Sequence, residues 1–212
     1  MVGRGSLPGD CPLTWAVIGL NLLTFLLDFA GFLAPARLGF DPLSFPARPW
    51  TALTYPLVGT GSILAVLVGA YAFWLLGGSL ERAWGGRDYL LFLALASLTS
   101  ALGLWVGTIL LGRVVFLSGL WMPLAAVTVA WSVIHPYERL LVYFAIPLEG
   151  RWLGLLATVL VFFSFPFPLG LFALSGCAFA WWYTRAGRYG PLTSPLESFR
   201  RWRRRRHLRR IL

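Results

Sequence analysis

The chain has 212 residues and a net charge of +10, and 58% of its residues are hydrophobic while 12% are charged. Its long apolar runs exclude a soluble globular domain and indicate a polytopic membrane protein. At about 20 residues per span, six spans and short loops fill the chain. We therefore predict an all-α membrane protein, a bundle of six transmembrane helices.

The apolar runs give the order of these helices. We predict spans 1 to 4 at residues 13–33, 62–80, 89–111 and 114–133. The run 140–146 is too short to cross a bilayer, so we expect it to be interfacial or re-entrant. The stretch 153–183 would form a helix of about 46 Å, too long for one span. Pro166 and Pro168 lie within it and divide it into spans 5 and 6.

The placement of the arginines predicts the topology. With six spans both termini share a side, and that side carries most of the arginines. Positive charge favours the cytoplasmic side, so we expect both termini in the cytoplasm. The predicted division is a cytoplasmic segment at 1–12, a membrane domain at 13–188 and an arginine-rich tail at 189–212.

The tail begins at a helix-start signal, because Ser194, Pro195 and Glu197 suit an N-cap, the first helical position and the third. We expect a basic helix with three alternative roles. It binds anionic lipid headgroups at roughly 1 kcal/mol per residue, it docks nucleic acid or a ribosome, or it is a topology signal alone. The basic residues are Arg200, Arg201, Arg203, Arg204, Arg205, Arg206, Arg209 and Arg210.

Several landmarks occur in a definite order along the membrane domain. They are Asn21 in span 1, Gly77-Gly78-Ser79-Leu80-Glu81-Arg82 at the end of span 2, Ser118-Gly119 at the start of span 4, Ala145-Ile146-Pro147-Leu148 in the next loop, and Gly176 in span 6. In this order and spacing the chain resembles the rhomboid family of intramembrane serine proteases. The resemblance covers roughly residues 12 to 188 and implies the rhomboid six-helix bundle.

Active rhomboid proteases use a serine of a Gly-x-Ser-Gly motif on span 4 and a histidine on span 6. The resemblance implies that Ser118 occupies the nucleophile position, although Phe116 replaces the first glycine of the motif. Counting back from Gly176 places Ala173 where the family has its histidine.

The family also uses a histidine and an asparagine on span 2 to stabilise the oxyanion. Counting back from Gly77 places Ala65 and Gly69 at those two positions, and span 2 contains neither residue type. We interpret the small residues as packing contacts, and Glu81 with Arg82 as a structural cap or ion pair at a span end. The residues assigned structural roles are Gly77, Gly78, Glu81, Arg82, Gly119 and Gly176.

The remaining chemistry argues against proteolysis. A serine hydroxyl needs an adjacent base to become nucleophilic. The two histidines, His135 and His207, lie outside the spans, and the sequence has no lysine to replace them. Loss of an oxyanion donor alone costs two to three orders of magnitude in rate. We therefore expect Ser118 to be vestigial and the chain not to be an enzyme.

Three functional hypotheses follow. The favoured one is a rhomboid-like pseudoprotease that binds transmembrane segments of other membrane proteins without cleaving them, in quality control or trafficking. The alternatives are a divergent active rhomboid protease and a structural membrane protein that docks a ribosome or nucleic acid through its tail. The two cysteines, Cys11 and Cys177, form no metal framework, and we expect no cofactor. For location we predict the bacterial cytoplasmic membrane.

Overall fold

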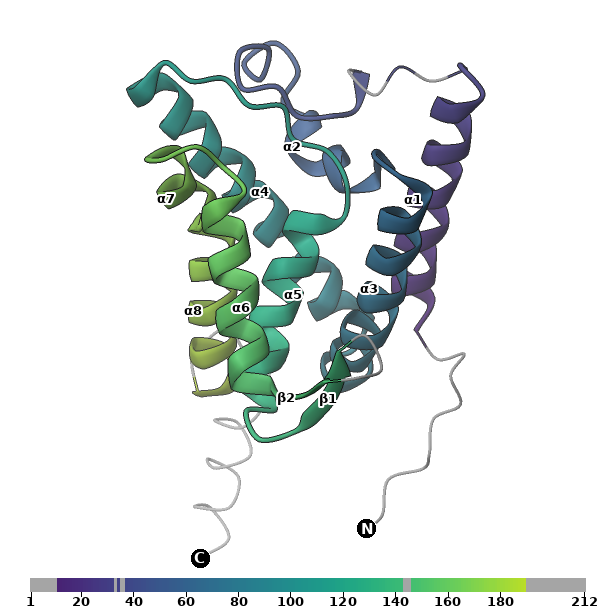
Figure 1. The fold of residues 1–212 in the computed structure, drawn as a ribbon, viewed down its shortest axis with the longest axis vertical. Coiled ribbons are helices and arrows are strands. Elements are labelled where there is room, and N and C mark those ends of the chain that lie inside the picture. Colours follow the sequence, from purple (N-terminus) through teal and green to yellow (C-terminus); the bar gives the residue numbers. More distant parts are fainter. Residues whose placement is uncertain (1–10, 33, 35–36, 143–145, 190–212) are drawn as a thin grey trace, which may run out of the picture.

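The computed structural model describes residues 11–32, 34, 37–142 and 146–189. Helices dominate it, and the long ones run alternately up and down through one bundle (Figure 1). Two strands, β1 (Arg139–Val142) and β2 (Ile146–Glu149), form an antiparallel hairpin. The helices are α1 (Pro12–Phe29), α2 (Thr51–Thr54), the 3-10 helix η2 (Tyr55–Leu57), α3 (Ile63–Trp84), α4 (Gly86–Leu111), α5 (Trp121–Ile134), α6 (Gly150–Phe163), α7 (Leu169–Ala173) and α8 (Ser175–Tyr189).

Three of the described helices are long and apolar enough to cross a membrane, which confirms a mainly helical membrane protein. They are α1 with 18 residues, α3 with 22 and α4 with 26. Helices α5 and α6 are apolar but have only 14 residues each. At 1.5 Å per residue they measure about 21 Å, less than the roughly 30 Å of bilayer hydrocarbon. The count of six spans and the side of the termini stay predictions.

The predicted start of span 4 at residue 114 is wrong, because α5 begins only at Trp121. Gly112 ends α4 in the left-handed conformation, with φ 65°, and Gly119 has φ 90°. Both conformations interrupt a right-handed helix. Between them the chain is extended, and Phe40 and Leu117 exchange two backbone hydrogen bonds of 2.8 Å. We call residues 113–120 the entry segment.

Three further expectations have different outcomes. The described residues of the run 140–146 lie in β1 and β2 and in no membrane-spanning helix, so the described fold is not purely helical. Its β-branched and aromatic residues favour strands over helix. The predicted division of 153–183 is confirmed, since α6 ends at Phe163 and α7 begins only after Pro168. Helix α1 ends at Phe29, four residues before the predicted limit of span 1.

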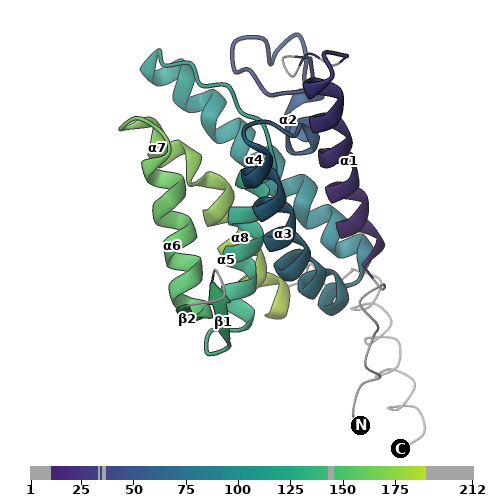
Figure 2. The ribbon, with the colours of Figure 1, turned by 45° about the vertical axis from the view of Figure 1, so that its right-hand side comes forward.

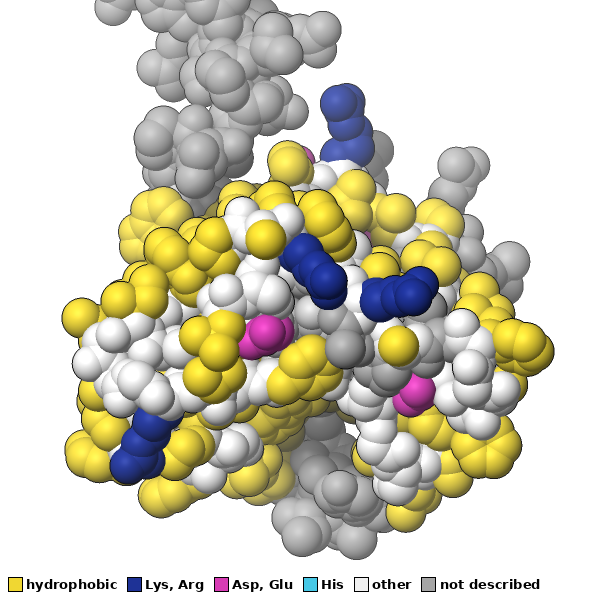
Figure 3. Space-filling view, turned by 90° about the horizontal axis from the view of Figure 1, so that it is seen from above, with side chains coloured by type: hydrophobic (Ala, Val, Ile, Leu, Met, Phe, Trp, Pro, Cys, Tyr) yellow, Lys and Arg dark blue, Asp and Glu magenta, His cyan; other side chains and the backbone are white. Residues whose placement is uncertain are grey.

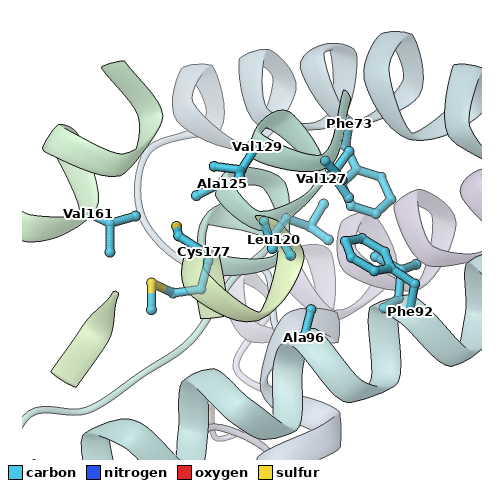
Figure 4. Close-up of a cluster of buried hydrophobic side chains, with 14 of the residues drawn as sticks. Phe73, Phe92, Ala96, Leu120, Ala125, Val127, Val129, Val161 and Cys177 are labelled. Carbon is cyan, nitrogen blue, oxygen red and sulfur yellow. The ribbon is translucent and has the colours of Figure 1, made fainter. Parts of the chain in front are cut away.

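Helix α5 forms the centre of the bundle and packs against α3, α6 and α8 (Figures 1 and 2). Figure 4 shows its side chains meeting those of the neighbouring helices in one apolar cluster. In lipid such contacts stabilise through van der Waals packing and not through water exclusion. The cluster includes Phe73, Phe92, Ala96, Leu120, Ala125, Val127, Val129, Val161 and Cys177.

Close approach between helices depends on Gly103 and Gly107, which the sequence did not mark, and on Gly176, which was predicted to be structural. A Cβ on Gly103 of α4 would overlap the hydroxyl of Ser175 and the carbonyl of Phe172. One turn later, Gly107 also lies against Phe172, so this Gly-xxx-Gly face holds α7 and α8. Gly176 of α8 lies in the same way against the Ser100 hydroxyl of α4.

The bundle has two chemically different ends. We call the end where α1 begins and α8 stops the terminal end, and the other the opposite end. At the opposite end the connection between α1 and α3 folds over the helices (Figure 1). Asn21 of α1 anchors it by donating to the Pro56 carbonyl at 3.0 Å. Figure 3 shows this end, where charged side chains are scattered singly among hydrophobic and uncharged groups.

Candidate functional site

Ser118 lies in the entry segment, three residues before α5 begins. Its hydroxyl is 2.8 Å from the hydroxyl of Thr60, which precedes α3. The next residue, Gly119, donates its N–H to the Tyr55 carbonyl at 3.0 Å. The serine is therefore fixed by the connection between α1 and α3. Sequence reasoning missed Thr60 because no motif marks it and 58 residues separate it from Ser118.

No titratable base lies beside this hydroxyl pair among the described residues. His135 follows the far end of α5, and the 14 residues of that helix separate it from Ser118 by about 21 Å. Its ring stacks on Trp131 at 5.2 Å and its Nε2 lies 3.8 Å from the Glu138 carboxylate. His207 is outside the described residues. A hydroxyl is a poor base for another hydroxyl, so the pair does not produce an activated nucleophile.

The three positions that the resemblance assigned to catalytic groups carry no polar side chain. Ala173 ends α7 and is completely buried. Ala65 lies in the first turn of α3, where its backbone N–H donates to the Ser62 hydroxyl at 3.2 Å. Ala65 is exposed, and a Cβ on Gly69 would meet nothing within 4 Å. The predicted small-residue face of α3 therefore lies open within the described chain.

A pocket of about 390 Å³ opens beside Ser118. The entry segment and the first residue of α5 form one wall, and the chain just after α6 forms the other. Five of the seven lining residues are apolar or aromatic, although polar atoms, backbone included, make up about half of the exposed pocket surface. The polar side-chain groups among the lining residues are the hydroxyls of Ser118 and Ser164 and the indole N–H of Trp121. The lining residues are Val115, Phe116, Leu117, Ser118, Trp121, Ser164 and Phe165.

Glu81 is a buried carboxylate, 4% exposed, at the terminal end. It accepts hydrogen bonds from the backbone N–H groups of Leu13 at 3.0 Å and Thr14 at 2.8 Å, and from the Thr14 hydroxyl at 2.7 Å. The first N–H groups of a helix have no partner within the helix and favour a negative charge. Glu81 thus caps α1 from a different helix.

The neighbouring residues complete this junction. Arg82 donates from Nη1 to the sulfur of Cys11 at 3.0 Å, and that thiol donates to the Gly78 carbonyl at 3.3 Å. A Cβ on Gly78 would lie 3.5 Å from the same sulfur, and one on Gly77 would overlap the Tyr89 hydroxyl. The cluster joins α1, α3 and α4 and has a structural explanation without a ligand.

The tail arginines and a possible metal site are the remaining candidates. The tail arginines, Arg200 to Arg210, lie outside the described residues. Within the part of the chain that the structure describes, no three His, Cys, Asp or Glu side chains gather as a metal site. The Ser118 pocket is therefore the candidate site with the most defined geometry.

Comparison with known proteins places the chain in a family. A family model described as eukaryotic integral membrane protein (DUF1751) matches residues 13–189. No curated protein matches the chain. The family match supports a membrane protein, in agreement with the long apolar helices. It also shows that the predicted bacterial cytoplasmic membrane is wrong, because the family is eukaryotic.

Proposed function

The chain belongs to the eukaryotic integral membrane protein family DUF1751, and within that family we propose for it the role of a rhomboid-like pseudoprotease. In this role it binds transmembrane segments of other membrane proteins without cleaving them. The observation that carries the proposal is the Ser118 hydroxyl paired with Thr60 in place of a base. The arrangement retains a serine at a pocket, and among the described lining residues none is a titratable base that could take its proton.

A membrane topology accompanies the proposal. The protein has six spans, with α7 and α8 forming the last, and both termini in the cytoplasm. The alternating direction of the helical segments brings the start of α1 and the end of α8 to one end of the bundle (Figure 1). The excess of arginine on that side of the sequence supports the cytoplasmic assignment.

The face presented by α3 and α6 supports binding of a client helix. Both helices pack against α5, which lies between them in Figures 1 and 2. On α3, Ala65 and Gly69 are small and leave room for a second backbone. Helices associate in lipid through close packing at small residues and through interhelical hydrogen bonds. The small residues of this face offer the first of these.

The shortness of α6 adds a reason for selectivity. Helix α5 is buried inside the bundle, but α6 has exposed apolar side chains and measures about 21 Å against roughly 30 Å of hydrocarbon, so lipid beside α6 must thin or α6 must be flanked by polar chain. A client segment with a polar residue or too few apolar residues loses less beside such a thin region than in the undisturbed bilayer. The proposed clients are therefore marginally hydrophobic transmembrane segments.

Photocrosslinking tests this proposal directly. A photoreactive residue replaces Ala65 on α3 or, as the matched control, Leu23 on the exposed face of α1. The client is a single-pass reporter whose apolar segment of about 20 residues carries one central asparagine. We expect a crosslink at position 65 that exceeds the control by about fivefold, with the reporter intact. Equal crosslinking at both positions contradicts the proposal.

Labelling with a fluorophosphonate separates the pseudoprotease from an active protease. We expect no labelling of Ser118 in folded protein, because no base activates it. Ser118→Ala is the control for background. Labelling that disappears in this variant, together with cleavage of the reporter, would establish an active enzyme instead.

A further inference from the structure

Three kinds of group lie in or next to the Ser118 pocket: the guanidinium of Arg113, the hydroxyls of Ser118 and Thr60, and apolar or aromatic side chains. Helix α4 has 26 residues, about 39 Å, which is close to the full thickness of a bilayer with its headgroups. Arg113 follows its end by two residues and therefore lies at headgroup level. Helix α5 is 12 residues (26 − 14) and about 18 Å shorter than α4, so the entry segment descends from Arg113 to Ser118.

Arg113 is not itself a lining residue but adjoins the lining in sequence on one side and through a hydrogen bond on the other. Its Nη1 donates to the Phe167 carbonyl at 3.2 Å, so the guanidinium bridges the chain on either side of the pocket. One wall begins two residues after Arg113, at Val115, and the other ends two residues before Phe167, at Phe165. The side chain is exposed, and no ion pair joins it to a carboxylate within the described part of the chain. Most of its five donors are free to bind an anion.

The hydroxyl pair of Ser118 and Thr60 supplies one neutral O–H donor. In the Ser118–Thr60 pair one hydroxyl donates to the other, and the proton of the second remains available. The Ser164 hydroxyl already donates to the Leu160 carbonyl at 2.6 Å. One free O–H suits a carbonyl oxygen.

The other five lining residues have apolar or aromatic side chains, of which Trp121 also carries an indole N–H. Phe116, Trp121 and Phe165 present aromatic surface below the arginine, and Trp121 is 37% exposed. A helix with its side chains is about 10–12 Å wide, so a pocket of about 390 Å³ is too small to enclose one beyond a single turn. A flexible chain fits this space better.

From the order of these groups we infer that the Ser118 pocket binds one glycerophospholipid of the leaflet at the opposite end. Arg113 binds the phosphate, the Ser118–Thr60 pair donates to an ester carbonyl, and one acyl chain lies along Trp121 and Phe165. Arginine pairs with phosphate oxygens through charge-assisted hydrogen bonds. The lipid site does not depend on the binding of a client protein.

Native mass spectrometry of the full chain in mild detergent tests the inference. Delipidated protein is titrated with dioctanoyl phosphatidylcholine, and bound lipid is counted. For Arg113→Gln we expect about tenfold weaker binding, the effect of losing one charge-assisted hydrogen bond. Arg113→Lys restores most of it. Arg48→Gln is the matched control, an exposed arginine at the same end of the bundle, and leaves binding unchanged.

Two further ligands identify the source of the phosphate. Dioctanoylglycerol, which lacks phosphate, should bind the wild type and Arg113→Gln equally. Excess inorganic phosphate should not displace the phospholipid, because it lacks the acyl chain and the ester. Equal losses in Arg113→Gln and Arg48→Gln would overturn the inference, as would displacement by inorganic phosphate. Ser118→Ala, expected to weaken binding by about threefold, checks the ester contact.

Discussion

Replacement of Glu81 by glutamine should destabilise the bundle by about 3 kcal/mol. In the structure one carboxylate oxygen accepts both hydrogen bonds from Thr14, and the other accepts the N–H of Leu13. Glutamine keeps one oxygen for Thr14 but turns an amide NH₂ toward Leu13. The bond to Leu13 is lost at about 1–3 kcal/mol, and each remaining bond loses roughly half of its charge-assisted strength.

Equilibrium unfolding in mixed micelles, with rising mole fraction of dodecyl sulfate and circular dichroism as the signal, measures this loss. Asp88→Asn is the matched control, because Asp88 is exposed and lies in the first turn of its own helix, α4. Its charge interacts with that helix end at about 0.3–1 kcal/mol. If Glu81→Gln lowers the unfolding free energy no more than Asp88→Asn does, Glu81 does not stabilise α1 as described.

Two substitutions test other contacts by the same measurement. Gly103→Ala should destabilise by about 1–3 kcal/mol, because the new methyl group overlaps the Ser175 hydroxyl. Gly69→Ala, on an open face, should be neutral or stabilising by about 0.5–1 kcal/mol, and equal losses in both would refute the packing. Asn21→Leu should cost about 1–3 kcal/mol by leaving the Pro56 carbonyl without its donor. A normal unfolding curve for Asn21→Leu would contradict that anchoring role.

The long helices were predictable because a bilayer imposes a minimum length of apolar sequence. The apolar runs placed α3 and α4 close to their observed limits, and Pro166 with Pro168 located the break after α6. The start of α5 was not predictable in the same way. The residues from 114 to 120 are as apolar as a span, and the conformation of Gly119 together with the bridge between Leu117 and Phe40 keeps them out of α5. Hydropathy does not contain that information.

The candidate site was predictable only in part. The position of Ser118 came from a resemblance, and the separation of His135 from it by the length of α5 came from counting residues. Its actual partner, Thr60, is brought close by the folding of the α1–α3 connection and carries no local signal. The same holds for Glu81, whose donors at Leu13 and Thr14 are more than 60 residues away in sequence. A carboxylate that caps its own helix forms a recognisable sequence motif. A carboxylate that caps a different helix, as Glu81 does, forms no such motif.

The entry segment explains why the bundle has a pocket beside Ser118. An extended chain that enters a helical bundle exposes backbone groups that lipid cannot satisfy. Here the Leu117 N–H and carbonyl bond to Phe40, and the Gly119 N–H bonds to the Tyr55 carbonyl. These bonds come from the α1–α3 connection, so the pocket depends on that connection and not on the helices alone. A ligand that displaces the Thr60 hydroxyl from Ser118 would therefore act first on the packing of α1, which the same connection anchors through Asn21.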